Sequence, residues 1–442
     1  MTNSITIMKR KIFCTVAALF FCGISHAQTI DERIGDAMNN ELWHELKELY
    51  DAQGKEIQTP FLKPLSEYFI AHFFNRPDTA LHYGNILLDK YQTELGGSVG
   101  SVMYFMADDA ARSGYPEYAG QILHAYNEAC RQAGLSDMGF EELEQQYNAL
   151  ARCGGFKVEK PGKDVKIPLI YHTGNRKDPV SISVNAEING KKASFNYDTG
   201  AGVNVMSHKL ANELGINLLD SAGIKVKGVT TMTSRFAIAD SIKLGDIVYR
   251  NIPFQIIDFS TGNTEADAKM RETGLQCVLG SQTMMPLGEI WFDFESSCLV
   301  VPAEPSSKPD YAPNMYRDAA NAFVVNVYDY ASDSNIEAVL DTGASYGGHT
   351  FKYYEKNRSL FEGIVPTDTI RYAGAGGVGY SKVCYKDMKY NIGGQTLRSD
   401  STTVSMEGSI QGEAHDMLLG LPEMTKFDRM IINFTDMWVK FE

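Results

Sequence analysis

Residues 195–201 read FNYDTGA, and residues 338–344 read AVLDTGA. Each stretch is a short strand-like run that ends in Asp-Thr-Gly, at 198–200 and again at 341–343. One such triplet occurs by chance in many proteins. Two copies, each at the end of an expected strand, indicate that the chain contains two related β-halves.

The sequence downstream of each triplet repeats as well. Both halves share an apolar-apolar-Gly run, a Met four residues after that glycine and a Phe fourteen residues after it: Val278-Leu279-Gly280, Met284 and Phe294, then Leu418-Leu419-Gly420, Met424 and Phe434. The Asp-to-Gly intervals are 280 − 198 = 82 and 420 − 341 = 79 residues. Ordinary strand-to-turn transitions in a β-barrel, the alternative explanation, account less well for this agreement.

The pattern around the triplets is that of short strands and tight turns. Residues 180–188 and 192–197 flank Asn189-Gly190, which tolerates the positive φ of a two-residue hairpin turn. Prolines at 302, 305, 309 and 313 then interrupt any regular ladder. We therefore expect one β-lobe at 165–302 and a second at 314–442.

Residues 28–155 have the apolar spacing of helices, for example in 60–74 and 98–112. Two related stretches, 75–80 and 113–118, contain prolines that are 116 − 77 = 39 residues apart. This region loosely resembles tetratricopeptide-like helical hairpins. A helical bundle without repeats remains the alternative. Such a domain would recruit a protein partner, or it would serve as a removable pro-segment.

The N-terminus has the three parts of a secretory signal. Lys9 to Lys11 are basic, residues 12–24 are apolar, and Ser25-His26-Ala27 offers small residues at the cleavage positions. We expect cleavage after Ala27 and an exported protein, periplasmic or secreted. Lipoprotein anchoring at Cys22 is disfavoured by the bulky Phe20 and Phe21. No later run is long and apolar enough to span a bilayer.

Composition narrows the possible functions. The 442 residues are 44% hydrophobic and carry a formal net charge of -14, which suits a globular protein and argues against nucleic-acid binding. Five cysteines remain after signal removal, and Cys277 and Cys298 either pair or stay as thiols. No phosphate loop, Ser-His-Asp elbow, zinc spacing or His-Glu-x-x-His motif is present, so we expect neither a cofactor nor a metal.

Over residues 165–442 the chain resembles the aspartic proteases of the pepsin and retropepsin superfamily. The resemblance implies a multidomain protein, with an all-α helical-hairpin domain followed by an all-β bilobal protease that acts on protein or peptide substrates. It implies that Asp198 and Asp341 form a catalytic pair that activates a water molecule. The supporting loop residues would be Thr199, Gly200, Ala201, Thr342, Gly343 and Ala344, in which the threonines brace the two loops and the glycines permit close approach to the carboxylates.

The residue after each triplet bears on pH dependence. Pepsin-like enzymes usually carry a hydroxyl there, whereas retropepsin-like enzymes carry alanine, as Ala201 and Ala344 do. A lost hydrogen bond to the charged carboxylate should raise its pKa. We therefore expect activity at mildly acidic to near-neutral pH.

Each half also offers a glycine-containing tip as a candidate flap over the substrate. The first tip is Gly228, Val229 and Thr230, and the second is Gly374, Ala375, Gly376 and Gly377. The alternative is that both are simple hairpin turns. Residues 345–350 depart from the family pattern because Gly347 and Gly348 weaken the expected strand, and we expect His349 to be structural or to line the substrate site.

The leading interpretation is an aspartic endopeptidase. The alternative is a catalytically inactive, peptide-binding scaffold whose helical domain recruits partners.

Overall fold

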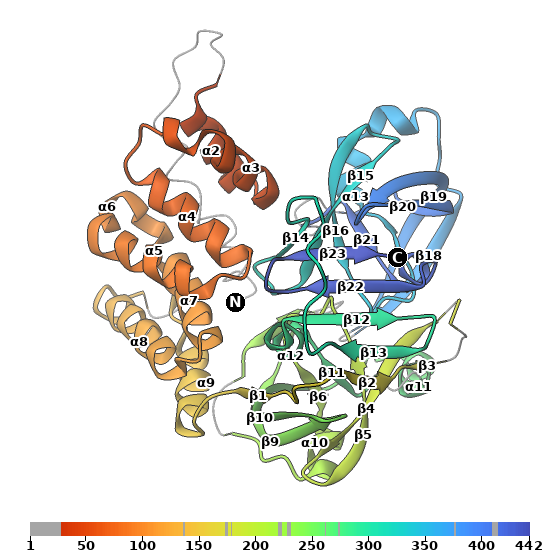
Figure 1. The fold of residues 1–442 in the computed structure, drawn as a ribbon, viewed down its shortest axis with the longest axis horizontal. Helices are drawn as coiled ribbons and strands as arrows, with labels where there is room; N and C mark the ends of the chain where they lie inside the picture. Colours follow the sequence, from red (N-terminus) through yellow and green to blue (C-terminus); the bar gives the residue numbers. More distant parts are fainter. Residues whose placement is uncertain are drawn as a thin grey trace. The chain divides into compact units, whose positions relative to one another are not determined.

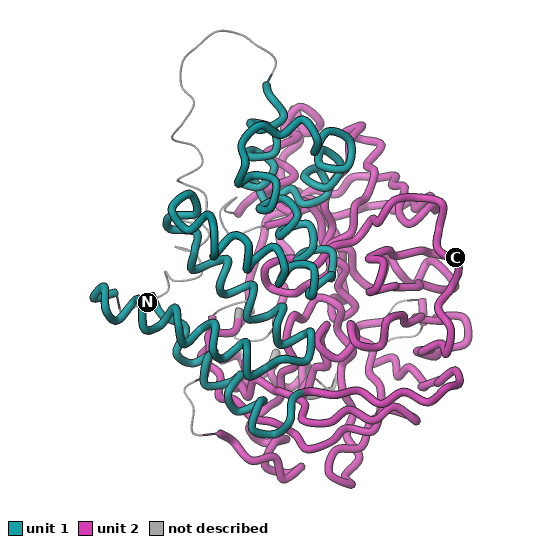
Figure 2. Tube along the Cα trace, turned by 60° about the vertical axis from the view of Figure 1, so that its left-hand side comes forward, with its two compact units in different colours: residues 1–155 teal, residues 156–442 magenta. Residues whose placement is uncertain are grey.

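The computed structural model describes residues 28–442 apart from 136–137, 173–175, 178, 220–222, 228–230, 261, 273–274, 375–376 and 409–413. The expected signal peptide, residues 1–27, lies outside the described residues. The chain divides into two compact units, residues 1–155 and 156–442 (Figure 2). Within the described residues, no helix combines the length and the apolar character needed to cross a membrane.

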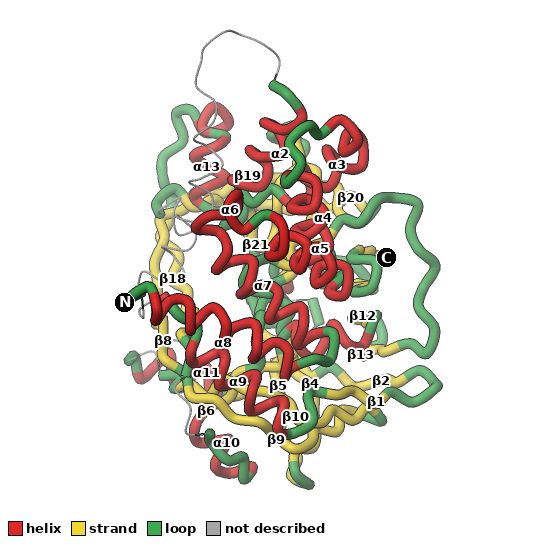
Figure 3. The backbone as a smooth tube through the Cα atoms, turned by 90° about the vertical axis from the view of Figure 1, so that its left-hand side faces the viewer, coloured by secondary structure: helices red, strands yellow, loops and turns green. Residues whose placement is uncertain are grey.

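The first unit is helical, as the sequence predicts. Its elements are α2 (Ile30–Asn39), α3 (Trp43–Gln53), η2 (Gly54–Glu56), α4 (Leu62–Phe73), α5 (Pro77–Lys90), α6 (Gln92–Leu95), η3 (Gly96–Ser98), α7 (Val99–Arg112), α8 (Pro116–Gln132) and α9 (Glu141–Arg152). Helices close in sequence contact one another, and Figure 3 shows α5, α7 and α8 as neighbouring red tubes. Pro77 and Pro116 occupy the first positions of α5 and α8, where a missing N–H has no helical partner to lose.

One turn geometry ends most of the longer helices in this unit. A residue with positive φ follows the helix, and the next N–H bonds to the carbonyl five residues back, which is the Schellman arrangement. The positive-φ residues are Glu41, Asn75, Gly114, Gly134 and Gly154, and the corresponding bonds are Leu42→Ala37, Arg76→Ala71, Tyr115→Ala110, Leu135→Cys130 and Gly155→Leu150. The unit is therefore built from a repeated local motif, while its resemblance to tetratricopeptide hairpins stays a prediction.

We call residues 165–302 the first β-half and residues 314–442 the second β-half. The strands up to the end of the first β-half are β1 (Lys157–Glu159), β2 (Val165–Pro168), β3 (Ile170–His172), β4 (Ser181–Ile188), β5 (Lys191–Tyr197), β6 (Val205–Ser207), β7 (Lys225–Lys227), β8 (Thr231–Thr233), β9 (Arg235–Leu244), β10 (Ile247–Ile257), β11 (Cys277–Leu279), β12 (Glu289–Asp293) and β13 (Cys298–Val301). Its helices are α10 (His208–Leu214), α11 (Thr264–Glu272), α12 (Ser281–Met284) and η5 (Met285–Leu287).

The second β-half has a comparable set of elements. Its strands are β14 (Met315–Arg317), β15 (Phe323–Asp329), β16 (Ser334–Leu340), β17 (Gly348–His349), β18 (Asp368–Gly374), β19 (Gly377–Ile392), β20 (Gln395–Ser405), β21 (Met417–Leu419), β22 (Arg429–Asn433) and β23 (Trp438–Phe441). Its helices are α13 (Phe351–Lys356), η6 (Arg358–Phe361) and α14 (Leu421–Met424).

Each β-half contributes one large sheet, and a third sheet joins them. The first sheet runs β1-β10-β6-β11-β5-β4-β3 with β9 against β10 and β4, and the second runs β14-β15-β16-β21-β17-β20-β19-β18. The joining sheet runs β2-β13-β12-β22-β23, so it takes strands from both halves. Its central pair, β12 and β22, is antiparallel and lies across the middle of the second unit (Figure 1).

Two elements of the structure can be compared with what the sequence predicted. The hairpin predicted at Asn189-Gly190 is present between β4 and β5, and both turn residues have positive φ, 50° and 77°. By contrast, residues 157–159, which the sequence left between the domains, form β1 and pair with β10. The strand is short and half polar, so its pattern alone does not distinguish it from a loop.

Candidate active site

Both Asp-Thr-Gly triplets begin where a strand ends. Asp198 follows β5 and Asp341 follows β16. Each of these strands pairs in parallel with the apolar-apolar-Gly strand of its own half, β11 or β21. The backbone N–H of Asp198 donates to the Leu279 carbonyl at 3.1 Å, and that of Asp341 donates to the Leu419 carbonyl at 3.0 Å. The downstream glycine-ending runs therefore hold the two aspartates in place.

The two triplet loops bond to each other through their threonines. The Thr199 hydroxyl donates to the Leu340 carbonyl at 2.6 Å, and the Thr342 hydroxyl donates to the Tyr197 carbonyl, also at 2.6 Å. Each hydroxyl also accepts from the backbone N–H of the opposite threonine at 3.0 Å. Both threonines are fully buried. The four bonds are reciprocal, so they lock the loops of the two halves together.

The glycine of each triplet lies against the aspartate of the other half. A Cβ placed on Gly200 would lie 2.6 Å from Cγ of Asp341, and one on Gly343 would lie 2.6 Å from Cγ of Asp198. The N–H of each glycine donates at 2.8 Å to Oδ1 of its own aspartate. Only a residue without a side chain allows the two loops to approach this closely.

The carboxyl groups of Asp198 and Asp341 are themselves hydrogen-bonded to one another. Desolvation by surrounding protein atoms raises the pKa of both groups, although both residues keep some exposure to solvent. For Asp341, the negative charge of Asp198 adds to desolvation and places its pKa well above the usual range. Two carboxyls in such contact share one proton, because both cannot be charged at once.

Backbone groups oppose this rise. N–H groups of Gly200, Ala201 and Gly343 bond to Asp198 and lower its pKa, and those of Gly343 and Ala344 do the same for Asp341. Ala201 and Ala344 contribute an N–H only, because alanine has no hydroxyl. These bonds favour the charged form of each carboxyl, whereas desolvation favours the neutral form.

The strands on either side of each candidate flap pair with one another. The first tip, residues 228–230, lies outside the described residues, between β7 and β8, which pair as an antiparallel hairpin. In the second, Gly374 and Gly377 form the last pair between β18 and β19, while residues 375–376 lie outside the described residues. The flap role of both tips stays a prediction.

Two tyrosines lie close to the second triplet. The surrounding protein raises the pKa of Tyr346 to about 12, with smaller contributions from Tyr372 and from Asp341, although 40% of the residue is exposed. Its ring centroid is 6.5 Å from that of Tyr372, on the strand that leads to the second candidate flap. This accessible aromatic surface was not singled out from the sequence.

His349 is a structural residue. It is buried, its Nε2 lies 2.8 Å from the Tyr390 hydroxyl, and its ring stacks on Tyr353 at 3.7 Å between centroids. Burial lowers the pKa of His349 to about 4, so it is neutral over the physiological range. The weakened strand expected here is short: β17 spans only Gly348–His349. Cys277 and Cys298 are both free thiols in the structure.

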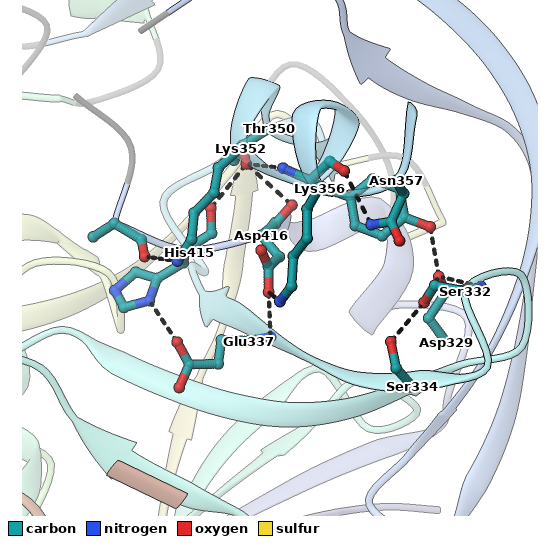
Figure 4. A network of polar contacts seen from close by, with 12 residues as sticks. Asp329, Ser332, Ser334, Glu337, Thr350, Lys352, Lys356, Asn357, His415 and Asp416 are labelled. Atoms are coloured by element: carbon teal, nitrogen blue, oxygen red, sulfur yellow. Dashed lines mark hydrogen bonds and ion pairs between the residues drawn. The ribbon is translucent and has the colours of Figure 1, made fainter. Parts of the chain in front are cut away.

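A polar cluster in the second β-half lies around His415 (Figure 4). His415 is 3.1 Å from Asp318 and 3.6 Å from Glu337, and these carboxylates raise its pKa to about 9 against the effect of burial. Nearby, buried Asp416 accepts from the N–H of Glu337 and lies 3.5 Å from Lys356. These contacts connect β16 with α13, so the cluster acts as structural support for both elements.

Among the described residues, one set of side chains has metal-like spacing. His72, Asp108 and Asp109 of the first unit offer ligand atoms within 4.8 Å of one another. Arg112 already bonds both carboxylates, at 3.0 Å from Asp108 and in close contact with Asp109. The guanidinium supplies the positive charge that a metal would bring, and the cluster ties α4 to α7.

Some residues that support the two aspartate loops were not predicted from the sequence. They lie at fixed distances along the chain from each aspartate. Ser207 and Thr350 each lie nine residues on, 207 − 198 and 350 − 341, and their side chains cap α10 and α13. Asn204, six residues after Asp198, accepts from the N–H of Gly280 at 2.9 Å. These spacings are visible in the sequence, but their meaning needs the packing.

Two comparisons bear on this site. A search among curated proteins found no match to the chain. Residues 184–283, which include Asp198 and extend from β4 through α12, match the family model described as aspartyl protease, so the first β-half is similar to that family.

Proposed function

We propose that the protein is an aspartic endopeptidase whose catalytic pair is Asp198 and Asp341. One observation carries the proposal: the two Asp-Thr-Gly loops are bonded to each other through their threonines, and each triplet glycine lies against the carboxyl of the opposite aspartate. The match of residues 184–283 to aspartyl proteases supports the same class of reaction.

The proposed chemistry follows from the shared proton. The charged aspartate takes a proton from a water molecule, and the water oxygen attacks the carbonyl carbon of the peptide bond. The protonated aspartate gives its proton to the carbonyl oxygen, which yields a neutral tetrahedral diol. Return of a proton to the peptide nitrogen breaks the C–N bond and leaves an acid and an amine. No covalent enzyme intermediate is needed.

The proposed enzyme is a single chain with two pseudo-symmetric lobes. The reciprocal threonine bonds and the matched glycine contacts support this arrangement, because each loop uses the other half as its partner. A peptide would bind in extended form beside the hairpins β7–β8 and β18–β19, with Tyr346 and Tyr372 as contacts on the second side. The lack of a hydroxyl at Ala201 and Ala344 supports a working range from mildly acidic to near-neutral pH.

We also propose that the protein is exported after cleavage behind Ala27. The first helix supports this cut, because its capping box is formed by Thr29 and Glu32 and would survive intact. N-terminal sequencing of the protein from its native cell should then begin at Gln28. A mature chain that begins elsewhere would contradict this cut.

The decisive test is a cleavage assay. The chain from Gln28 onward is incubated with a diverse peptide library at pH 3 to 8, and cut sites are read by mass spectrometry, with Asp198→Asn and Asp341→Asn as matched controls. We expect cleavage by the wild type and at least about 1,000-fold slower cleavage by either variant. A wild type that binds peptides without cutting them would favour the inactive scaffold. Equal cutting by the variants would exclude this pair.

A further inference from the structure

The Asp198 and Asp341 loops depend on one peptide group each, and these two peptides are held by different residues. The Leu279–Gly280 peptide accepts the Asp198 N–H, and the Leu419–Gly420 peptide accepts the Asp341 N–H. The other end of each peptide is the N–H of the glycine. A partner for that N–H therefore fixes the peptide that holds the aspartate.

In the first β-half the partner is an amide. Asn204 Oδ1 accepts from the Gly280 N–H at 2.9 Å, and its Nδ2 donates to the Pro253 carbonyl at 3.1 Å. Asn204 is 1% exposed. Because an amide does not titrate, this support is independent of pH.

In the second β-half the corresponding position has no side chain. Both Asn204 and Gly347 lie six residues after their aspartates, 204 − 198 and 347 − 341. Glu423 fills the vacated space: a Cβ on Gly347 would lie 2.7 Å from Cδ of Glu423 and would overlap its Oε2. The N–H groups of Gly420 and of Glu423 itself bond to the Glu423 carboxyl. An acid thus takes the place of the amide.

The surroundings of this acid are unusual for a carboxylate. Glu423 is 6% exposed, and its Oε2 has no hydrogen-bond partner among the described residues. Burial raises the pKa of Glu423, while Lys426 and the N–H groups of Glu423 and Gly420 lower it. Tyr390 of β19 interacts with Glu423, and its hydroxyl lies 2.8 Å from Nε2 of His349. Neither Tyr390 nor His349 is a cation at neutral pH. Asp341 lies on the far side of the Leu419–Gly420 peptide.

We propose that Glu423 is a positioning residue for Asp341: its carboxyl holds the Leu419–Gly420 peptide, as Asn204 holds the Leu279–Gly280 peptide. The inference rests on the proposed function for its kinetic consequence. Ionisation of Glu423 places a second negative charge behind a pair that already carries one. The loop that holds Asp341 then loosens, and hydrolysis declines on the alkaline side of the pH profile.

The first measurement compares wild type with Glu423→Gln and Glu423→Ala. Glutamine keeps an acceptor for the Gly420 N–H but does not titrate, so we expect kcat at pH 5 within about threefold of wild type and an alkaline decline moved to higher pH. Alanine removes the acceptor and should lower kcat about tenfold or more at every pH. Identical alkaline limbs for wild type and Glu423→Gln would overturn the proposal.

A second measurement needs no activity. An acid whose folded pKa is raised contributes stability that is complete below its unfolded pKa and is lost as pH rises through the folded value. The Tm of Glu423→Gln should therefore gain on that of the wild type between pH 4 and pH 8. If wild type proves inactive, the protease proposal fails while this comparison still decides the state of Glu423. Parallel Tm curves would contradict a buried neutral acid.

A transplant gives the sharpest control. The residue at the place of Glu423 in the first half is Thr283, since 283 − 280 and 423 − 420 are both three. Gly347→Asn alone should lower Tm and activity by its overlap with Glu423. The double variant Gly347→Asn with Glu423→Thr should recover both and lose the alkaline decline. A double variant no better than Gly347→Asn would show that the two positions are not equivalent.

Discussion

The two β-halves present the same loop to the site and support it by different chemistry. The strand, the triplet and the glycine contact recur in both halves, and the paired threonine bonds have equal lengths, 2.6 Å for the two hydroxyl donors and 3.0 Å for the two N–H donors. Behind the loops the agreement ends. Asn204 supports the first, whereas Glu423 and the charged cluster around His415 support the second. The shared geometry is thus fixed where the halves meet, and each half supports it with different residues.

Among the tests that compare the two halves, the largest effect should come from filling the glycine contacts. Alanine at Gly200 or Gly343 places a Cβ against the opposite carboxyl and forces the pair apart. We expect kcat to fall about 100-fold or more in either variant, because displacement by a fraction of an ångström is enough to disrupt proton sharing. Since the contacts are matched, the losses should agree within about threefold. A large loss in only one variant would show that the halves do not contribute equally.

The threonine bonds test the same equality through stability. Thr199→Val and Thr342→Val each remove a donor and an acceptor and leave a buried N–H of the other loop without its partner. We expect each to lower the free energy of unfolding by about 3 kcal/mol, measured by denaturant titration. Ser281→Ala, which removes a single 3.3 Å bond to the Gly202 carbonyl within the first β-half, is a milder control. Unequal losses would mean that the loops are not reciprocal partners in solution.

The charged cluster should give the second β-half a pH dependence of its own. The folded pKa of His415 is raised to about 9, so its contribution to stability is complete below about 6.5 and is lost as pH rises through about 9. His415→Gln should therefore destabilise the protein by about 2 kcal/mol at pH 6 and much less at pH 10. Thermal unfolding across this range is the measurement. A pH-independent difference would exclude a charged His415.

The smallest effect distinguishes the two helix caps. Ser207→Ala removes a single capping bond at α10, and we expect a loss of about 1 kcal/mol. Thr350 caps α13 and also donates to the His415 and Asp416 carbonyls, so Thr350→Ala should cost more. Chemical denaturation of both variants resolves the order. The reverse order would argue that the second β-half does not depend on this contact.

The sequence by itself determined the features that local physics sets. Apolar spacing fixed the helical region, and Asn189-Gly190 fixed a hairpin, because turn and helix preferences act between residues close in the chain. The internal repeat placed Asp198 and Asp341 at equivalent ends of strands. Prediction from the sequence failed where the pattern is short. The strand β1 was left between the domains, and the aromatic pair Tyr346 and Tyr372 was not recognised.

Only the tertiary structure decided what surrounds the aspartates. That Gly200 packs on Asp341, that His349 is buried against Tyr390, and that Glu423 fills the space left by Gly347 are contacts between residues distant in sequence. No local preference encodes them, because they arise when strands from separate segments are brought into register. The raised pKa values of the pair follow from the same packing, since desolvation and the neighbouring charge exist only in the folded chain.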